Sequence, residues 1–148
     1  MKAAAESIAA QPSRVDELEA VIRASGGVIE LPLNHIFTPG LYVREVMLPK
    51  GSISISKIHK TTHPFVISHG SVSVWTKDGG IVQLSAPHTG ITTPGTQRVI
   101  YAHEDTIWST FHPTNETDLE KIEADIIQPH TNPLLADEVM RQLKEPKA

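Results

Sequence analysis

The feature that most constrains this fold is a series of short apolar segments that alternate with polar residues and are separated by turns. Residues 41–48 alternate in this way, and Pro49-Lys50-Gly51 turns the chain back. Further segments lie at 53–59, 65–68, 72–76 and 81–84, and Lys77-Asp78-Gly79-Gly80 between the last two is a strong hairpin signal. Short strands at this spacing predict an antiparallel sandwich or barrel rather than alternating β-α units.

Helical patterns flank the predicted strands. Ser13 is placed to cap a helix over Val15 to Ile22. A second helix is expected at about 117–127, with Asn115 or Thr117 as its cap. We therefore expect one domain that is mainly β, with an N-terminal tail and helix over 1–30, a β-barrel and its C-terminal helix over 31–129, and a C-terminal tail over 130–148.

Composition excludes several classes of function. The net charge of -4 lacks the basic surface that nucleic-acid binding needs, so we expect no nucleic-acid partner. The chain contains no cysteine, which removes disulfides, thiolate nucleophiles and thiolate metal sites. No segment approaches the roughly 20 apolar residues of a membrane span, and the start lacks the apolar run of a signal peptide. We therefore expect a cytoplasmic protein without a membrane partner.

Period-two alternation also assigns faces within the strands. Residues that share a face are Tyr42, Arg44, Val46 and Leu48 in one strand, Arg98, Ile100 and Ala102 in another, and Thr106, Trp108, Thr110 and His112 in the last. Val99, Tyr101 and His103 take the opposite face of the strand that carries Arg98. In the strand that carries Arg98, either the face of Arg98 or the face of Tyr101 must be the interior of the fold. The pattern leaves open which of the two it is.

Histidine and lysine concentrate between two predicted strands, from Lys57 to Gly70. Lys57 and His59 are two residues apart, so they should point to the same face of one strand. His63 follows a short polar link that can turn the chain, which would bring its imidazole beside that of His59. The alternative is that His63 lies in a loop and His59 on the surface.

The first motif of this region resembles that of the cupin superfamily. Gly51 and Gly70 match the family's glycines, and His59 matches its second histidine. Lys57 falls where the first histidine belongs, and His63 falls where the glutamate belongs.

The second motif is similar to the cupin Pro-x-Gly-x-x-His. Gly95 matches, Pro94 is offset by one position, and Arg98 replaces the histidine. The resemblance covers roughly 31–129 and implies a cupin or jelly-roll barrel that retains one of the four usual metal ligands. It also implies a homodimer or higher cyclic oligomer, because cupin-like barrels commonly pair through sheet edges and pairing removes exposed edges.

A closer likeness is to small cupin-like proteins of bacteriophages and prophages. It rests on Lys57-Ile58-His59-Lys60, Pro94-Gly95-Thr96, Tyr101-Ala102-His103-Glu104-Asp105-Thr106-Ile107-Trp108 and Glu116-Thr117-Asp118-Leu119-Glu120-Lys121-Ile122-Glu123. This resemblance implies a bacterial host cell for a phage-encoded protein, and it implies no particular reaction.

The substitutions in the two motifs favour an anionic ligand over a metal. Lys57 and Arg98 put positive charge where cupins present neutral imidazoles, and two cations would repel a dication. Converging in a barrel, they would form a donor-rich pocket for a carboxylate or phosphate, with Arg98 as a bidentate clamp. The predicted ligand-binding residues are Lys57, His59, His63, Arg98, Tyr101, Glu104 and Trp108.

The other hypothesis is a metal-dependent small-molecule enzyme in which His59, His63 and His103 hold a divalent transition metal. Glu104 beside His103 also permits acid-base chemistry on a bound ligand. No nucleophile is recognisable, so the sequence leaves open whether the protein is a catalyst or a binding protein.

Several residues keep a purely structural alternative. Trp108 is either a wall of the pocket or part of the core. Arg98 is either the clamp or an arginine paired with Glu45 or Glu104. The remaining histidines, which we interpret as loop or surface residues without a role, are His35, His69, His88 and His130.

Overall fold

The computed structural model describes residues 13–130 and 132–135. These belong to two compact units. The β-unit consists of residues 30–129, and the terminal unit combines the described residues before 30 with those after 129. The predicted tail over 1–12 and most of the predicted C-terminal tail, 136–148, lie outside the described residues. No helix in the described ranges is long and apolar enough to cross a membrane.

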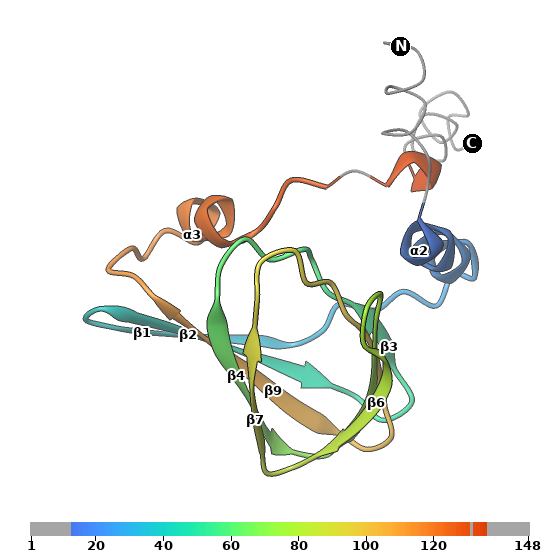
Figure 1. The fold of residues 1–148 in the computed structure, drawn as a ribbon, viewed down its shortest axis with the longest axis horizontal. Coiled ribbons are helices and arrows are strands. Elements are labelled where there is room, and N and C mark those ends of the chain that lie inside the picture. The colour runs from blue at the N-terminus through green and yellow to red at the C-terminus, as the bar shows by residue number, and fades with distance from the viewer. Residues whose placement is uncertain (1–12, 131, 136–148) are drawn as a thin grey trace, which may run out of the picture. The chain divides into compact units, whose positions relative to one another are not determined.

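In the β-unit, nine described strands form two antiparallel sheets (Figure 1). The five-stranded sheet has the order β1 (Leu33–Thr38), β2 (Leu41–Leu48), β9 (Thr106–Pro113), β4 (His63–His69) and β7 (His88–Thr92). The four-stranded sheet has the order β3 (Ile53–Ile55), β8 (Val99–Ala102), β5 (Ser71–Thr76) and β6 (Gly80–Ser85). The mainly β fold of jelly-roll type is therefore confirmed, as two sheets rather than one closed barrel.

The strands alternate between an inner face and an outer face. In β8, Ile100 and Ala102 are buried, whereas Tyr101 is 41% exposed. The face that Arg98 shares with Ile100 is therefore the interior, which decides the alternative that the sequence left open. The same alternation turns Tyr42 and Leu48 of β2 inward.

The main core lies between the two sheets and centres on a pair of stacked aromatic rings. Phe65 of β4 and Trp108 of β9 have ring centroids 4.5 Å apart and planes 9° apart. Around them the buried core residues are Leu48, Ile67, Val72, Val74, Ile100 and Ala102. Stacked aromatic pairs of this kind add to the stability that their buried area provides.

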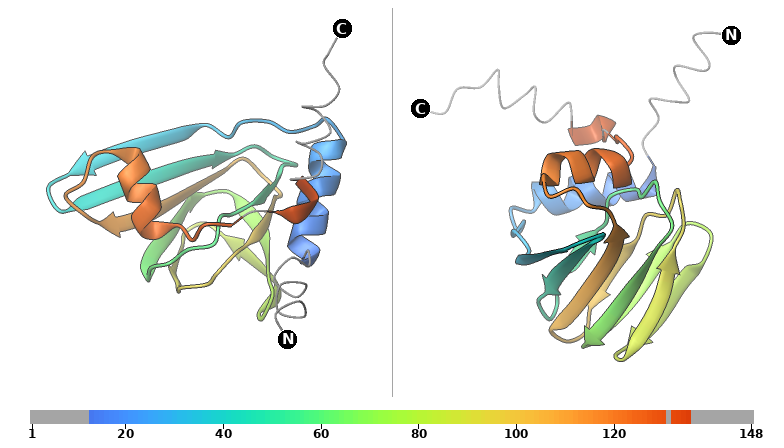
Figure 2. Two further views of the ribbon diagram at one scale, coloured as in Figure 1. Left: turned by 90° about the horizontal axis from the view of Figure 1, so that it is seen from above. Right: turned by 90° about the vertical axis from the view of Figure 1, so that its left-hand side faces the viewer.

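The helix α3 (Leu119–Ile126) covers one end of the five-stranded sheet (Figure 2). Its N-cap is Asp118, one residue beyond the predicted Thr117, and the Asp118 side chain accepts a hydrogen bond from the backbone of Glu120. Ile122 and Ile126 bury their side chains against Tyr42 of β2. The apolar face of the predicted helix therefore closes a second, smaller core.

Three strand boundaries differ from the prediction. β3 ends at Ile55, so Lys57 and His59 lie beyond it, and His59 forms an isolated bridge with Ile127. The predicted turn over 85–90 is partly strand, because β7 begins at His88. β1 spans residues over which we predicted no strand. In each case a partner strand, rather than the local pattern, decides where pairing starts and stops.

The terminal unit is held by a buried carboxylate. Helix α2 (Arg14–Ala24) starts at Ser13, which forms a capping box with Asp16. The Asp16 carboxylate also pairs with His130 at 2.8 Å, so His130 has a structural role, contrary to our interpretation. Burial raises the pKa of Asp16, but the hydrogen bonds from Ser13 and His130 outweigh it, and the net effect lowers this pKa.

Gly70, between β4 and β5, allows a stability test. It has a φ of +97°, and a Cβ there would lie 2.5 Å from the backbone oxygen of Asp105 and against Thr106. Gly40 has a φ of +79°, but its Cβ would meet nothing within 4 Å. We expect Gly40→Ala to lower the free energy of unfolding by about 1–2 kcal/mol, and Gly70→Ala to lower it by about 1–3 kcal/mol more. Urea denaturation measures both, and equal losses would contradict the close packing of Gly70.

Candidate functional site

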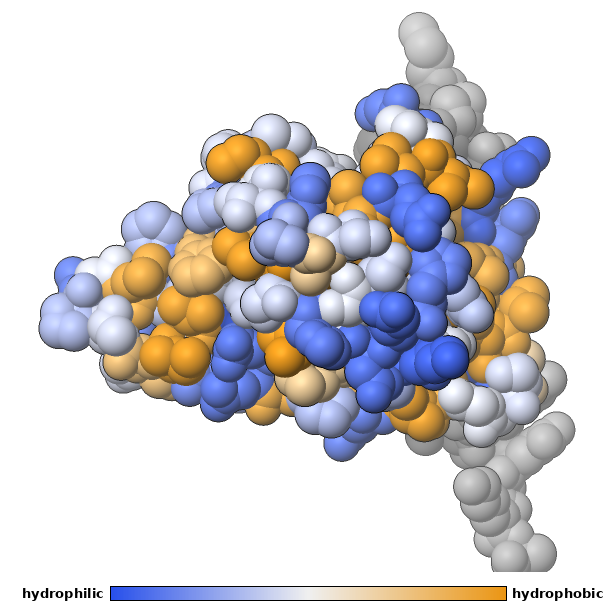
Figure 3. Space-filling view, turned by 90° about the horizontal axis from the view of Figure 1, so that it is seen from below, coloured by the Kyte–Doolittle hydropathy of each residue, from blue (hydrophilic) through white to orange (hydrophobic). Residues whose placement is uncertain are grey.

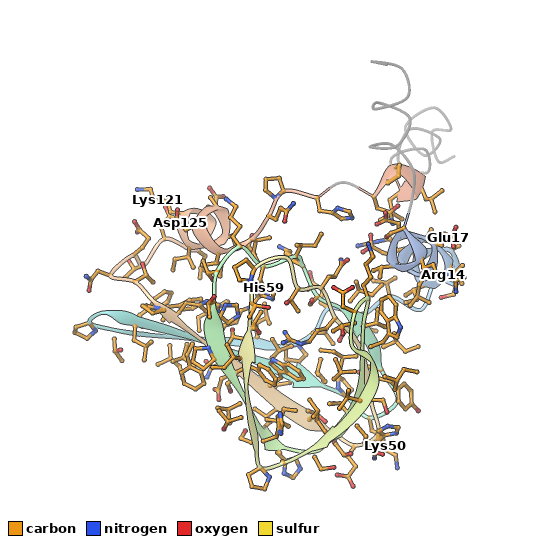
Figure 4. All side chains as sticks on the ribbon, viewed as in Figure 1. Arg14, Glu17, Lys50, His59, Lys121 and Asp125 are labelled. Carbon is orange, nitrogen blue, oxygen red and sulfur yellow. The ribbon has the colours of Figure 1, made fainter. Side chains whose placement is uncertain are left out.

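Three imidazoles gather at the end of the five-stranded sheet that α3 covers. The structure brings His59 and His63 together, with ring centroids 4.8 Å apart. His112, near the end of β9, adds a third ring 4.4 Å from that of His63. Figure 4 shows His59 between α3 and the strands, whereas Lys121 and Asp125 of α3 point away from it.

The backbone of His59 is fixed by two neighbouring segments. Its N–H donates to the carbonyl of Thr96 at 3.2 Å, and its carbonyl accepts from Gly95 at 2.8 Å. The bridge to Ile127 and the bond from the Lys60 N–H to the Ile126 carbonyl join it to the end of α3. The segment with the cupin-like Pro-Gly pattern therefore holds the histidine of the first motif directly.

Each of the three rings has one buried nitrogen without a hydrogen-bond partner among the described residues. These atoms are Nδ1 of His59, Nε2 of His63 and Nδ1 of His112. The opposite nitrogens of two rings are bound, His63 to the Thr61 hydroxyl at 3.2 Å and His112 to the Thr110 hydroxyl at 2.8 Å. Unpaired buried nitrogens are costly, so they point to a group that the protein alone does not supply.

The three imidazoles are neutral at pH 7. Burial, followed by the neighbouring His63, Arg98 and Arg44, lowers the pKa of His59 to about 4. Burial, followed by His63, His59 and Arg44, lowers the pKa of His112 to about 3. Burial and the charge of Arg98 also lower the pKa of His63. Each ring can therefore donate one hydrogen bond without adding a charge.

Arg98 lies inside the sandwich, as the first hypothesis requires. Its guanidinium carbon is 4.7 Å from the centroid of Phe65 and 5.6 Å from that of Trp108, which are cation-π distances. One guanidinium nitrogen donates to the Thr92 hydroxyl at 2.9 Å. The predicted alternative of a pair with Glu45 does not form, because Glu45 accepts from Asn34 instead.

Arg44 is a second inward-facing arginine, and the sequence analysis did not select it. Its Nε is buried and has no hydrogen-bond partner in the described part of the chain. Neither Arg44 nor Arg98 takes part in a salt bridge with a described residue. We call Arg44, His59, His63, Arg98 and His112 the donor cluster. In the sequence pattern, Arg44 shares a face with Tyr42, and His112 shares a face with Trp108. This pattern could have identified both residues as inward-facing.

A cavity of about 500 Å³ opens beside the donor cluster. Its polar lining includes Arg44, His59 and Thr110, with Glu30 and Lys57 also on the wall. The apolar lining consists of Leu31, Leu33, Val46, Leu48, Ile55, Ile100, Trp108 and Ile127. Its volume lies in the range of small-molecule sites, which is about 300–1,000 Å³. Trp108 is both core and cavity wall, so its two predicted roles coexist.

The other predicted site residues do not join the donor cluster. Lys57 lines the cavity together with His59, but its ammonium group pairs with Glu123 of α3 at 3.0 Å, and both side chains are about half exposed. Tyr101 and His103 lie together on the outer face of the four-stranded sheet, where His103 binds the Ser73 hydroxyl at 2.7 Å. Glu104 is exposed and lines a separate shallow depression with His69. The structure therefore does not bring Tyr101, His103 and Glu104 together with His59.

A metal of the cupin kind does not fit the described residues. They contain no group of three or more His, Asp or Glu side chains placed to hold a metal ion. The predicted set of His59, His63 and His103 is not assembled, because His103 is held on the outer face by Ser73. Within the donor cluster, the charges of Arg44 and Arg98 would also oppose a cation.

The buried imidazoles make the stability of the β-unit depend on pH. The unfolded chain protonates these histidines near pH 6.5, whereas in the folded chain His59 and His112 stay neutral down to about pH 4 and about pH 3. Unfolding therefore takes up protons below pH 6.5, and the free energy of unfolding should fall as the pH falls from 7 to 4. Each imidazole contributes up to about 1.4 kcal/mol per pH unit in this window.

Urea denaturation followed at pH 7, 6, 5 and 4 measures this slope. His59→Asn should reduce it, and the matched change His69→Asn, at an exposed position outside the cluster, should leave it unchanged. At lower pH, protonation of Asp16 weakens the Asp16–His130 pair. This also lowers the free energy of unfolding as the pH falls. A slope that is the same in all three proteins would contradict neutral burial of His59.

No protein-family model and no curated protein matches this chain. Among solved structures, it is similar to the salicylate 1,2-dioxygenase of Pseudaminobacter salicylatoxidans, at 11% identity and a TM-score of 0.53, covering 74% of this chain and 34% of that chain. It is also similar to a cupin-2 domain containing protein of Shewanella frigidimarina, at 13% identity and a TM-score of 0.47, covering 62% and 89%. A third similar structure is a double-stranded β-helix domain of Klebsiella pneumoniae, at 17% identity and a TM-score of 0.49, covering 60% and 81%.

At these identities the likeness concerns the fold alone. The dioxygenase is the one of the three whose TM-score exceeds 0.5, and this chain spans about a third of its length. Together with the two antiparallel sheets, the comparison supports a jelly-roll fold for the chain.

Proposed function

We propose that this protein binds a small organic anion in the cavity of its β-unit, with the negative group held by Arg44 and His59. The observation that carries the proposal is the Arg44 side chain, which lines the cavity while its buried Nε has no partner in the described residues. The other guanidinium nitrogens of Arg44 are not buried, and they form no hydrogen bond with a described residue. An anion in the cavity that Arg44 lines could accept from these nitrogens.

The surrounding charges favour an anion over a cation. Arg44 and Arg98 both lower the pKa of His59, so His59 lies in the positive potential of two guanidinium groups. No described carboxylate forms a salt bridge with either arginine. A carboxylate or phosphate could accept from Arg44 and from the neutral imidazole at the same time, and such charge-assisted bonds are the strong ones.

Arg98 and His63 lie near His59 but do not line the cavity. We keep both as ligand-site residues, as predicted from the sequence, but we assign them an indirect role instead of direct contact with the ligand. Arg98 does not line the cavity, and its guanidinium lies over Phe65 and Trp108. Its contribution is the positive charge that it adds near His59, whereas direct contact belongs to Arg44.

The proposal describes a binding protein and assigns no reaction. Arg44, His59 and Thr110 can orient an acid, and the Glu30 carboxylate on the same cavity wall makes no hydrogen bond with a described residue that would identify it as a base. The resemblance to phage and prophage proteins, and with it a bacterial host cell, stays a prediction about origin.

We also propose a homodimer or higher cyclic oligomer. Apolar side chains are exposed on the β1–β2 hairpin, where Ile36 and Phe37 are about two-fifths accessible, and on β3, where Ile53 is about half accessible. Figure 3 shows apolar surface at the end of the molecule where this hairpin lies. Light scattering at micromolar concentration should give at least twice the mass of one chain, and a monomer mass would contradict the proposal.

Small organic anions should stabilise the protein, and Arg44 should be required. The melting temperature should rise with the logarithm of the anion concentration above its dissociation constant. Arg44→Met keeps most of the side-chain volume and removes the charge, so it should cost about 1.5–3 kcal/mol of binding free energy. Differential scanning fluorimetry with carboxylates and phosphate measures both effects.

Arg14→Met is the matched control, because it removes the same charge from an exposed position of α2. This variant should respond to anions as the parent does. Arg98→Met should weaken the response less than Arg44→Met, since Arg98 does not line the cavity. If no carboxylate or phosphate moves the melting temperature of the parent, or if Arg44→Met responds fully, the anion-binding proposal is wrong.

A further inference from the structure

The lining of the cavity changes from polar to apolar along the five-stranded sheet. In the β2–β9 register, Arg44 lies opposite Thr110, and Val46 lies opposite Trp108. All four residues line the cavity, as does Leu48, which is two residues further along β2. Two residues of strand span about 7 Å, so the floor runs about 13 Å along β2 from the Cα of Arg44 to the Cα of Leu48.

The facing wall is mixed. Ile100 of β8 lines the cavity and is buried, and Ser54 of β3, which pairs with Ile100 in the four-stranded sheet, also lines it. Along the floor formed by β2 and β9, the donors lie at the end near Arg44 and Thr110. Beyond Val46 and Trp108 this floor offers no positive charge to a second negative group, and the Glu30 carboxylate lies on the cavity wall.

From this gradient we infer that the ligand is a monocarboxylic acid with an apolar body about 7–13 Å long. Its carboxylate accepts from Arg44, and its hydrocarbon part lies along Val46 and Trp108 towards Leu48 and Ile100. Trp108 presents an aromatic surface to the cavity, so the body is either an aromatic ring or an extended alkyl chain. This inference rests on the proposed binding of an organic anion and names the class of that anion.

The gradient also excludes two other classes of acid. Inorganic phosphate and acetate would satisfy Arg44 and leave the apolar part of the cavity without a partner. A dicarboxylate such as succinate would bring its second carboxylate against Val46 and Trp108, which offer it no positive charge, and the Glu30 carboxylate lies on the wall of the same cavity. Each buried methylene of a monocarboxylate instead removes apolar area from water, which tightens binding a few-fold.

Isothermal titration calorimetry on the full chain tests the inference with six probes. These are hexanoate, benzoate, acetate, succinate, inorganic phosphate and hexanamide, the last a neutral analogue of hexanoate. We expect hexanoate and benzoate to bind at least tenfold more tightly than acetate, succinate or phosphate. Hexanamide should bind at least tenfold more weakly than hexanoate, because it cannot form a charge-assisted bond with Arg44.

A matched pair of variants locates the apolar body. Val46→Thr adds one hydroxyl to the floor of the cavity at nearly constant volume, and should weaken hexanoate several-fold while leaving acetate unchanged. Val43→Thr makes the same change on the opposite face of β2, outside the lining, and should bind hexanoate as the parent does. Thermal melting of both variants verifies that they are folded.

The outcomes separate this inference from the proposed function. If acetate, succinate and phosphate bind as tightly as hexanoate and benzoate, the anion site stands and the apolar ligand class is wrong. If hexanamide binds as tightly as hexanoate, the cavity is apolar only and both the anion-binding function and the acid class are wrong. If none of the probes binds, both proposals are wrong. Equal hexanoate affinity in Val46→Thr and Val43→Thr would also overturn the inferred position of the body.

Discussion

The arrangement of this molecule depends on the stack of Phe65 on Trp108, because it joins the core to the site. The two rings come from neighbouring strands and lie parallel at 4.5 Å. The rings pack with buried aliphatic residues between the sheets. They also carry the guanidinium of Arg98, whose charge is tolerated because the ring faces are electron-rich. Burial is the largest cause of the lowered pKa values of His59 and His63, and the charge of Arg98 adds to it.

The alternation of apolar and polar residues made the strands and their faces predictable. The same alternation placed Arg44 and His112 on inward faces, but we did not select them as site residues. Arg44 and His112 share faces with Tyr42 and Trp108. A single polar residue in an apolar pattern is more often an isolated exception to the pattern than part of a binding site. Lys57 was misplaced because β3 stops at Ile55, after which the chain follows the segment from Thr96 to Arg98. Pairing between distant strands decides such endpoints, and local sequence does not encode it.

The degenerate cupin-like motifs correctly predicted that His59 and His63 lie close together. They did not predict which residues line the cavity. His59 and His63 do lie together, and Arg98 does point inward. Tyr101 and His103, by contrast, point outward on the same strand segment, as the period of two requires once Ile100 is buried. Selecting one face of β8 from the start would have removed both residues from the candidate site. The extra imidazole of His112 comes from outside either motif, on the last strand.

The backbone of His59 gives this site a property beyond its charges. Its N–H and carbonyl are both engaged with the Gly95–Thr96 segment, and its neighbour Lys60 is bound to the last turn of α3. Loops that must be ordered when a ligand arrives consume part of the interaction free energy. Here the chain is ordered by its own main-chain hydrogen bonds before any ligand is present. The entropy of the segment has already been lost on folding, so a molecule that reaches the imidazole meets a preorganised donor.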